Sequence, residues 1–490
     1  MEGVEVERPL KLHFIPYLAP GHMIPLGDIA TLFALRGQQV TIITTPSNAH
    51  FFTKSLSFAN PFFLRLHTVE FPSLQVGLPD GVESMSSTTD SVTANKIFAG
   101  TVLLQGPIQD FMEKDPPDCI IGDVIYPWVH DLAHKLHIPA FSFSVFSIFT
   151  ISLMESLRTN NFFHSHTDSD SGPFVVHNFP HSITMCSRPP KMFTIFMEMM
   201  LERMIKNNEQ LIINNFTELD GEEFIEHYEK TTGLKSWHLG PASLIRKTDQ
   251  EKAERGNESV VSVHECLTWL NSKKDNSVLY ICFGSICYFS DIQLYEIACG
   301  IEASGHKFLW VVPEKIGKED ESDDEKKKWL PKGFEERNIG KNGLIIRGWA
   351  PQIMILSHAA VGSFMTHCGW SSIVESVSAG VPMITWPVHT EQFYNEKFIT
   401  DVRRIGVEVG ATEWYLSGIE EKEKVVSKDS IEKAVKRLMD GGDEGEEIRG
   451  RAREFRDKAR LAVQEGGSSN KNLLALIDEL KRLRDHKSLD

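Results

Sequence analysis

Polar side chains gather at a turn between two predicted strands, where they could bind an anion. The pattern predicts a buried strand at Val361–Met365, a helix at Ser371–Ala379 that ends at Gly380, and a second strand at Val381–Trp386. A glycine-containing turn that opens a helix after a strand presents free backbone N–H groups and the positive end of the helix dipole. We therefore expect an anion-binding site at this turn.

Three side chains extend this predicted site. His367 and Ser372 can donate hydrogen bonds to the anion. Glu375, one turn into the helix, can accept hydrogen bonds from a diol. The pattern is typical of a site for a ligand that carries both a negative charge and vicinal hydroxyls.

A second pair of residues could move a proton. His22 follows a predicted strand at Leu12–Leu18, and Asp123 follows another at Cys119–Gly122. Open α/β sheets bind ligands at the carboxyl edge, where both residues are expected. Imidazole suits a general base near neutral pH, and a carboxylate can orient and stabilise it. A structural role for His22 and a helix-capping role for Asp123 remain the alternatives.

One further motif resembles a metal site. His130 and His134 lie four residues apart with Asp131 between them, a spacing found in zinc-protease helices. No third ligand is apparent in the sequence, so we interpret them as ordinary helix histidines and expect no metal site.

Composition bounds the class of protein. The 490 residues suggest two domains, and the net charge of −16 argues against nucleic acid or an anionic membrane as partner. The seven cysteines are scattered, which favours a reducing compartment. Ile138–Met154 is too short and polar for a membrane span, and the N-terminal residues do not form a signal peptide. We expect a cytoplasmic protein without integral membrane association.

Strands alternate with helical patterns in two series, which predicts two doubly wound α/β domains in tandem. A charged segment at 246–256 separates the series. The expected organisation is an N-terminal domain at 1–245, a linker at 246–263, a C-terminal domain at 264–467 and a helical tail at 468–490. The predicted strands, besides those named above, are Gln39–Thr45, Phe141–Val145, Gln210–Asn214, Val278–Phe283, Phe308–Val312 and Leu344–Ile346.

The stretch from Trp349 to Gln392, which contains WAPQ, HCGW, ES and EQ in that order, resembles the signature box of plant secondary-product UDP-glycosyltransferases. The resemblance implies the GT-B architecture, in which two Rossmann-like domains face each other across a cleft and the C-terminal helix returns to the N-terminal domain. It also implies a UDP-sugar donor, His22 as the general base with Asp123 as its partner, and a domain-specific split between acceptor binding (N-terminal) and donor binding (C-terminal).

The donor-site roles are carried over from the family position by position. Trp349 would stack on uracil, Gln352 and Glu375 would bind the ribose, and Glu391 with Gln392 would contact the sugar hydroxyls. The implied donor-binding residues are Gly21, Ser285, Trp349, Ala350, Gln352, His367, Trp370, Ser371, Ser372, Glu375, Glu391 and Gln392.

Gln392 bears on the choice of sugar. In this family a glutamine here goes with glucose, and a carboxamide can accept from one sugar hydroxyl and donate to the next. Two residues depart from the family pattern, Ser371 at a phosphate contact and Val145 at the sugar, and only the second weakens this expectation. Ser371 replaces a common asparagine, and Val145 stands where a small or hydroxyl residue often contacts the sugar, with Ser144 as a weak substitute. UDP-glucose is the expected donor and UDP-xylose the alternative, with no cofactor or metal.

The acceptor is expected to be small and hydrophobic, because phenylalanines cluster near the presumed cleft. The segments GHMIPLGDIA and QFYNEK resemble the branch with legume saponin glycosyltransferases, so a triterpenoid or its glycoside is favoured over a flavonoid or phenol. We expect a monomer in which two loops, Glu83–Asp90 and Phe162–Gly172, border the acceptor pocket. A charged loop, Lys315–Lys328, should lie in solvent. The phenylalanines are Phe141, Phe143, Phe146 and Phe149.

Two other classes of protein are disfavoured. An NAD-dependent oxidoreductase needs GxGxxG after the first strand, where this chain has APGHMIP. A non-catalytic UDP-sugar binder would be expected to lack His22 or Asp123, and both are present.

Overall fold

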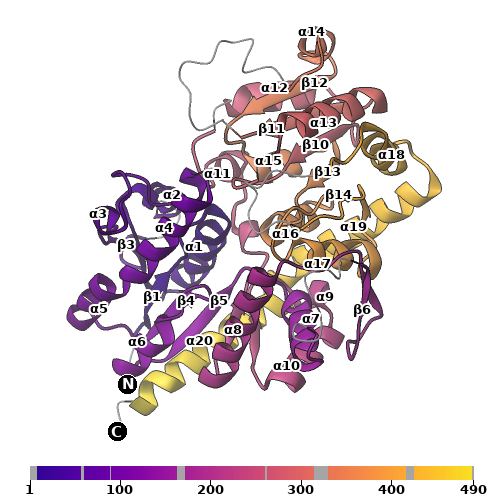
Figure 1. Cartoon of the computed structure of the whole chain (residues 1–490). Coiled ribbons are helices and arrows are strands. Elements are labelled where there is room, and N and C mark those ends of the chain that lie inside the picture. Colours follow the sequence, from indigo (N-terminus) through magenta and orange to yellow (C-terminus); the bar gives the residue numbers. More distant parts are fainter. Residues whose placement is uncertain are drawn as a thin grey trace.

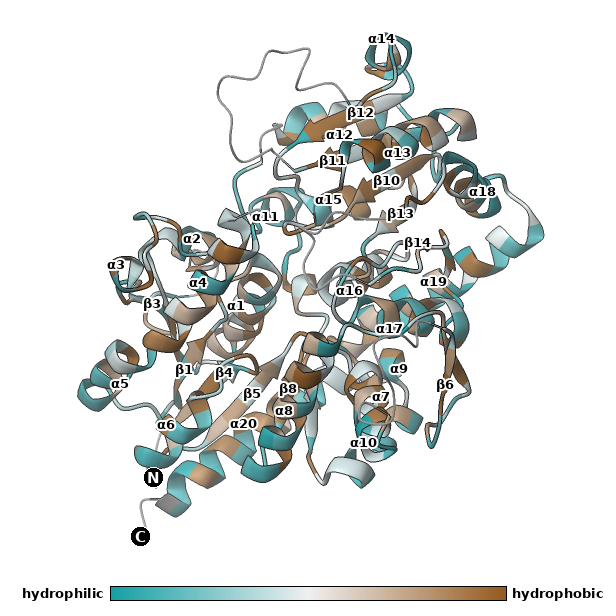
Figure 2. Cartoon of the chain, in the orientation of Figure 1, coloured by the Kyte–Doolittle hydropathy of each residue, from teal (hydrophilic) through white to brown (hydrophobic). Residues whose placement is uncertain are grey.

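Two parallel β-sheets, each flanked by helices, form the two halves of the protein (Figure 1). The computed structural model describes residues 8–56, 60–88, 90–162, 172–259, 262–287, 289–313, 329–414 and 424–487. The strands are coloured brown in Figure 2 because their residues are hydrophobic, as expected for sheets buried on both faces.

The N-terminal sheet has the strand order β3-β2-β1-β4-β5-β8-β9, and its paired strands are parallel. Ile15 pairs with Gly122, so the carboxyl ends of β1 and β4 lie next to each other. The strands are β1 Lys11–Ile15, β2 Gln39–Thr44, β3 Leu64–Thr68, β4 Cys119–Asp123, β5 Ala140–Ser144, β8 Leu211–Ile213 and β9 Ser236–His238.

The C-terminal sheet has the order β12-β11-β10-β13-β14-β15 and is also parallel. Cys282 pairs with Thr366, which brings the turns that follow β10 and β13 together. The strands are β10 Val278–Cys282, β11 Lys307–Val312, β12 Gly343–Arg347, β13 Val361–Thr366, β14 Met383–Thr385 and β15 Gly406–Glu408. A separate antiparallel hairpin joins β6 Phe174–Val176 to β7 Ile183–Met185.

Helices connect the strands. In the N-terminal half they are α1 Pro20–Leu35, α2 His50–Leu56, α3 Ser73–Val76, α4 Ser91–Leu103, α5 Gln105–Lys114, α6 Val129–Lys135, α7 Ile148–Thr159, α8 Lys191–Asn207, α9 Thr217–Asp220 and α10 Glu222–Thr232. The later helices are α11 Asp249–Ala253, α12 Val263–Asn271, α13 Asp291–Ser304, α14 Phe334–Asn338, α15 Gln352–Leu356, α16 Trp370–Ala379, α17 Gln392–Lys397, α18 Lys428–Met439, α19 Asp443–Ala462 and α20 Ser468–Lys487. Short 3₁₀ turns lie at Pro46–Asn48, Met85–Ser87 and Ala242–Ile245, and a π-helical turn lies at Phe398–Val402.

Several predicted boundaries shift by a few residues. The first strand ends at Ile15, not Leu18, and α1 begins at Pro20, which supplies the fixed φ favoured at a helix start. His22 therefore lies in the first turn of α1. Five strands of the described part of the chain were not predicted. One is β3, which reads LRLHT, and the other four are 3 residues long: β6, β7, β9 and β15.

The last helix returns to the N-terminal half (Figure 1). Leucine and isoleucine side chains at i, i+3, i+4 and i+7 form one apolar face of α20, and they are buried in the same core cluster as β1 and α1. The Ser469 hydroxyl donates to the carbonyl oxygen of Gly240 at 2.5 Å. The buried residues are Leu473, Leu476, Ile477 and Leu480.

The segment predicted as a linker has structure of its own. It contains α11, and capping boxes begin both α11 and α12, with Thr248 and Ser262 as the N-cap residues. The charged stretch Lys315–Lys328 and most of Phe162–Gly172 lie outside the described residues.

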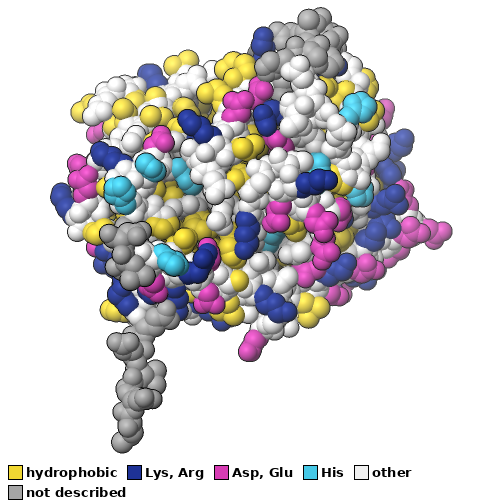
Figure 3. Space-filling model, turned by 90° about the horizontal axis from the view of Figure 1, so that it is seen from below, with side chains coloured by type: hydrophobic (Ala, Val, Ile, Leu, Met, Phe, Trp, Pro, Cys, Tyr) yellow, Lys and Arg dark blue, Asp and Glu magenta, His cyan; other side chains and the backbone are white. Residues whose placement is uncertain are grey.

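On the face shown in Figure 3, basic side chains are interspersed with acidic ones and do not gather into a basic patch. Within the described residues, every helix is too short or too polar to cross a membrane.

Candidate active site

A cavity of about 810 Å³ lies between the two halves of the protein. Side chains from the turn after β1, from α1 and from α8 line one side, and the predicted signature box lines the other. All of the predicted donor-binding residues line this cavity, together with His22. The structure thus brings together residues that lie far apart in the sequence.

His22 and Asp123 meet at the edge of the cavity because β1 and β4 are neighbours. Nδ1 of His22 lies 2.8 Å from Oδ2 of Asp123, and the carboxylate is 1% exposed. The other carboxylate oxygen accepts from the backbone N–H of Ile125 at 3.0 Å. Helix α6 begins at Val129, so Asp123 does not cap it.

This arrangement leaves one ring nitrogen of His22 for chemistry. Asp123 holds Nδ1, so Nε2 is the atom that can accept a proton from a bound hydroxyl. The His22 side chain is 18% exposed and lines the cavity. Tyr17 packs against the His22 ring through an edge contact, with 5.2 Å between ring centroids. The geometry is that of a general base with an orienting carboxylate.

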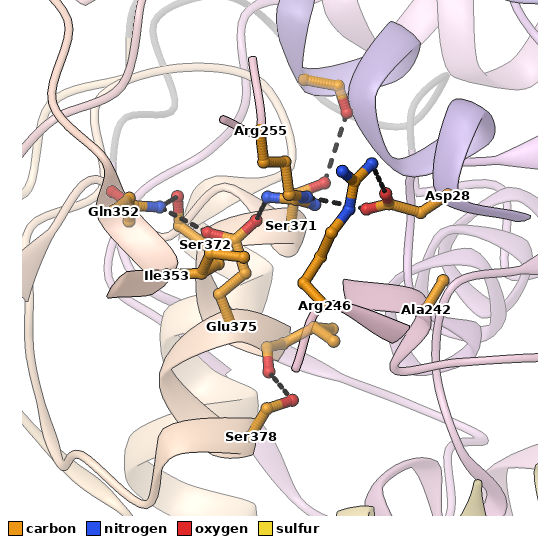
Figure 4. A network of polar contacts seen from close by, with 12 residues as sticks. Asp28, Ala242, Arg246, Arg255, Gln352, Ile353, Ser371, Ser372, Glu375 and Ser378 are labelled. Atoms are coloured by element: carbon orange, nitrogen blue, oxygen red, sulfur yellow. Dashed lines mark hydrogen bonds and ion pairs between the residues drawn. The ribbon is translucent and has the colours of Figure 1, made fainter. Parts of the chain in front are cut away.

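Glu375 and Gln352 are hydrogen-bonded to each other on the donor side (Figure 4). Nε2 of Gln352 donates to Oε2 of Glu375 at 2.7 Å and to Oγ of Ser372 at 3.0 Å. Tyr280 donates to Oε1 of Gln352 at 3.3 Å. Because a carboxylate offers about four lone-pair sites, Glu375 keeps capacity for a ribose diol.

Arg255 joins this group and was missed from the sequence. Its Nη1 lies 2.5 Å from Oε1 of Glu375, and its Nε lies 2.7 Å from Oδ2 of Asp28 in α1 (Figure 4). Arg246 contacts the other oxygen of Asp28 at 3.1 Å. An arginine in a charged segment between domains is typical of a solvent-exposed loop, and no local pattern distinguishes this one.

His367 lies at the end of β13, where two glycines make room for its ring. A Cβ atom on Gly284 would lie 2.8 Å from Cε1 of His367, and one on Gly369 would lie 2.5 Å from Nε2. Burial lowers the pKa of His367 to about 4, so the ring is neutral near pH 7 and has one N–H to donate. Ser285 follows Gly284 and also lines the cavity.

Ser371 makes a hydrogen bond across the cleft between the two halves of the protein. Its hydroxyl donates to the carbonyl oxygen of Gly21 at 3.3 Å, in the turn that leads to His22. The residue that replaces the family's common asparagine therefore connects the N-terminal end of α16 to the N-terminal half.

The expected hydrogen bonding of Gln392 needs a correction. Its Oε1 accepts from the backbone N–H groups of Val388 and His389, at 2.9 and 3.0 Å. Both lone pairs of the carbonyl oxygen are engaged, so the side chain can donate through Nε2 but cannot also accept from a sugar. Glu391 beside it is buried, and this burial raises the pKa of its carboxyl.

Val145 lines the cavity, as expected for a residue near the sugar. The suggestion that Ser144 substitutes for a hydroxyl there is wrong. Ser144 is fully buried, and its Oγ accepts from the backbone N–H of Phe146 at 3.0 Å within the turn after β5.

The acceptor side is apolar, but the predicted phenylalanines mostly do not form it. Phe146 lines the cavity, whereas Phe141, Phe143 and Phe149 are buried in the hydrophobic cores. Helix α8 contributes two aromatic rings that share a face by their i, i+3 spacing, a signal the sequence offered. Met85 and Ser86 also line the cavity, in agreement with the prediction that the loop Glu83–Asp90 borders it. The apolar residues on this side that were missed are Tyr17, Ile125, Phe193 and Phe196.

His130 and His134, the pair with zinc-protease spacing, do not line the cavity. His130 Nε2 lies 2.9 Å from Oγ of Ser142, which in turn donates to Glu209 at 2.7 Å. Burial lowers the pKa of His130. Across the described part of the chain, no group of three or more His, Cys, Asp or Glu side chains could hold a metal ion.

Known proteins of one enzyme family are similar to this chain. The family model for UDP-glucoronosyl and UDP-glucosyl transferases matches residues 81–442. UDP-glucosyl transferase 73CC6 of Saponaria officinalis is 45% identical, with 98% of this chain and 99% of that protein covered. The UDP-glucose flavonoid 3-O-glucosyltransferase 7 of Fragaria ananassa is 44% identical, with 97% and 96% covered.

The structure is also similar to a solved one. UGT73P12 of Glycyrrhiza uralensis, complexed with glycyrrhetinic acid 3-O-monoglucuronide, gives a TM-score of 0.88 at 38% identity and covers 98% of this chain and 97% of that one. The chain therefore belongs to the UDP-glycosyltransferase family. The predicted family, its enzyme class and the GT-B fold are confirmed.

Proposed function

We propose that this enzyme transfers glucose from UDP-glucose, with inversion, to a hydroxyl or carboxyl group of a small hydrophobic plant metabolite. The observation that carries the proposal is the His22–Asp123 pair, with 2.8 Å between Nδ1 and Oδ2, at the edge of a cavity that the N-terminal end of α16 also lines. A proton acceptor and an anion site thus border the same space.

The proposed step is a single displacement. Nε2 of His22 takes the proton of the acceptor hydroxyl while its oxygen forms a bond to the anomeric carbon of the donor. The bond from that carbon to the diphosphate oxygen breaks, and UDP leaves with the electron pair. Backbone N–H groups at the start of α16, together with His367 and Ser372, stabilise the charge on the departing diphosphate.

We favour a triterpenoid or its glycoside as the acceptor. The apolar side of the cavity offers aromatic rings from the turn after β5 and from α8 to a large hydrophobic molecule. The similar Glycyrrhiza structure contains glycyrrhetinic acid 3-O-monoglucuronide. Both observations support a large polycyclic acceptor.

A flavonoid acceptor is the second candidate, because the Fragaria relative is named for flavonoid 3-O-glucosylation at nearly the same identity. Incubation of the enzyme with UDP-glucose and a mixture of triterpenoids, triterpenoid glycosides and flavonoids, read by mass spectrometry, distinguishes the two. We expect glucosylated triterpenoids to dominate. A dominant flavonoid product would replace the first proposal with the second.

The same assay tests whether a metal takes part. We propose that none is needed, because N–H and O–H donors surround the presumed diphosphate position. Activity should persist in EDTA. Loss of activity on chelation that Mg²⁺ restores would contradict this part of the proposal.

A further inference from the structure

Four buried charged side chains form a continuous chain across the cleft (Figure 4). Arg246 and Arg255 both contact Asp28, and Arg255 also contacts Glu375. Each of the four side chains is at most 7% exposed. Buried charges of this kind persist only when they are paired, so removing one member leaves its partner unsatisfied. Arg255 is the member that contacts both halves of the protein.

We propose that Arg255 is a positioning residue for the ribose of the donor, and this inference depends on the proposed UDP-sugar site. Arg255 and Gln352 each hold one oxygen of the Glu375 carboxylate, at 2.5 and 2.7 Å. With both oxygens anchored, the carboxylate is fixed in one orientation and keeps a lone pair on each oxygen for the two ribose hydroxyls.

The segment that carries Arg255 is held against the same part of the site. A Cβ atom on Gly256 would lie 2.3 Å from Cζ2 of Trp349, so the backbone there is packed directly on the indole. Asn257 is hydrogen-bonded to His50 of α2, with 2.6 Å between Oδ1 and Nε2. These contacts place Arg255 beside the position expected for the nucleoside.

Arg255 also connects the ribose site to the catalytic helix. Its Nε contacts Asp28, which lies in α1, the helix whose first turn carries His22. A side chain that holds Glu375 and α1 at once fixes the nucleoside end of the donor relative to the base. A lysine could keep the charge but could not make both contacts, because its ammonium lacks the guanidinium fork.

The test is a comparison of UDP with 2′-deoxy-UDP, measured by titration calorimetry on wild type and three variants. Arg255→Gln removes the contact with Glu375. Arg246→Gln is the matched control, because it removes a buried cation from the same Asp28 without touching Glu375. Arg255→Lys is the conservative variant, and thermal denaturation identifies any variant that does not fold.

We expect wild type and Arg246→Gln to prefer UDP over 2′-deoxy-UDP by about tenfold, the usual scale for one hydrogen bond to a charged group. Arg255→Gln should lose most of this preference by weakening UDP about tenfold and 2′-deoxy-UDP less than about twofold. Arg255→Lys should fall between them.

Equal weakening of both ligands in Arg255→Gln would show that Arg255 only joins the two halves, and would overturn the inference. Tighter binding of UDP would show that Arg255 blocks the ribose, and would overturn it too. Should Arg255→Gln not fold, retention of the full preference in Arg255→Lys would overturn it. Failure of wild type to bind UDP at all would contradict the donor-site proposal itself.

Discussion

The two sides of the cavity are built differently. On the donor side, several polar side chains are already hydrogen-bonded to one another or to the backbone, as in the Gln352–Glu375 pair and the anchored oxygen of Gln392. On the acceptor side, the lining is mostly apolar and is drawn from segments far apart in the chain, from Tyr17 to Phe196. We infer that the donor side tolerates little change, whereas the acceptor side can vary in shape.

The largest expected effect on activity comes from substitution of the proposed base, His22, which lies where the donor and acceptor sides of the cavity meet. His22→Ala should lower kcat by about 10²-fold or more with every acceptor, because it removes the Nε2 atom that takes the proton, while the affinity for UDP stays nearly constant. Steady-state kinetics and calorimetry measure the two quantities.

Asp123→Asn should act in the same direction and combine non-additively with His22→Ala, since the pair works as one unit. The exposed His134 is a matched control, and His134→Ala should retain wild-type activity. A His22→Ala enzyme within a few-fold of wild type would rule out His22 as the base.

A smaller effect is expected on the donor side. Gln392→Glu keeps an oxygen for the N–H groups of Val388 and His389 but replaces the Nε2 donor with a second acceptor. We expect kcat/KM for UDP-glucose to fall by about tenfold or more, the cost of a lost and unreplaced hydrogen bond in a buried site. Binding of UDP, which lacks the transferred sugar, should change little.

The same residue bears on the choice of sugar. Wild type should prefer UDP-glucose over UDP-galactose by about tenfold in kcat/KM. UDP-xylose is the informative third donor, because Val145 offers no hydrogen bond in this part of the cavity. A preference for xylose or galactose would show that Gln392 does not determine the sugar.

The contrast between the two sides also explains what the sequence could predict. The donor side lies largely in one continuous stretch. Local pattern predicted the anion site at the turn before α16, and the family resemblance supplied the roles of the other residues from Trp349 to Gln392. Arg255 was out of reach, because its role depends on a long-range contact with Asp28 that local pattern does not encode.

The residues that line the acceptor side were harder to predict from the sequence for the same reason. Phe141, Phe143 and Phe149 are as hydrophobic as Phe193 and Phe196, and composition alone does not separate core from cavity. The hydrogen bonds of Gln392 were also unpredictable, since they depend on how the turn before α17 folds back on the side chain. His22 and Asp123 could be placed at one edge of the sheet because each follows a predicted strand, and the structure brings them together because β1 and β4 are neighbours.

The acceptor side itself should show a moderate and selective effect. Phe196→Ala removes a half-buried ring from the cavity, so KM for a large hydrophobic acceptor should rise by about three- to tenfold through lost apolar contact. KM for UDP-glucose should stay constant. Met199→Ala is the control on the same helix, because Met199 is 65% exposed and does not line the cavity. An equal change for donor and acceptor would contradict the separation of the two sides.

The last prediction concerns stability, and its effect on the reaction rate should be the smallest. Glu396 is buried in α17 and accepts from the Thr385 hydroxyl at 2.7 Å. Burial raises the pKa of Glu396 to about 8 from an ordinary value of 4.5. Between these values the folded state binds more protons than the unfolded state, so stability falls as pH rises through this window.

Glu396→Gln cannot titrate but can still accept from Thr385. Its melting temperature should match wild type near pH 5 and exceed it near pH 8.5. The difference in unfolding free energy between variant and wild type grows at up to about 1.4 kcal/mol for each pH unit across this window. Glu447→Gln, a change at a 72% exposed carboxylate in α19, is the control and should leave the pH profile unchanged. Parallel profiles for Glu396→Gln and wild type would mean that Glu396 is ionised in the folded protein, and the donor side would then hold a buried negative charge in place of a neutral acid.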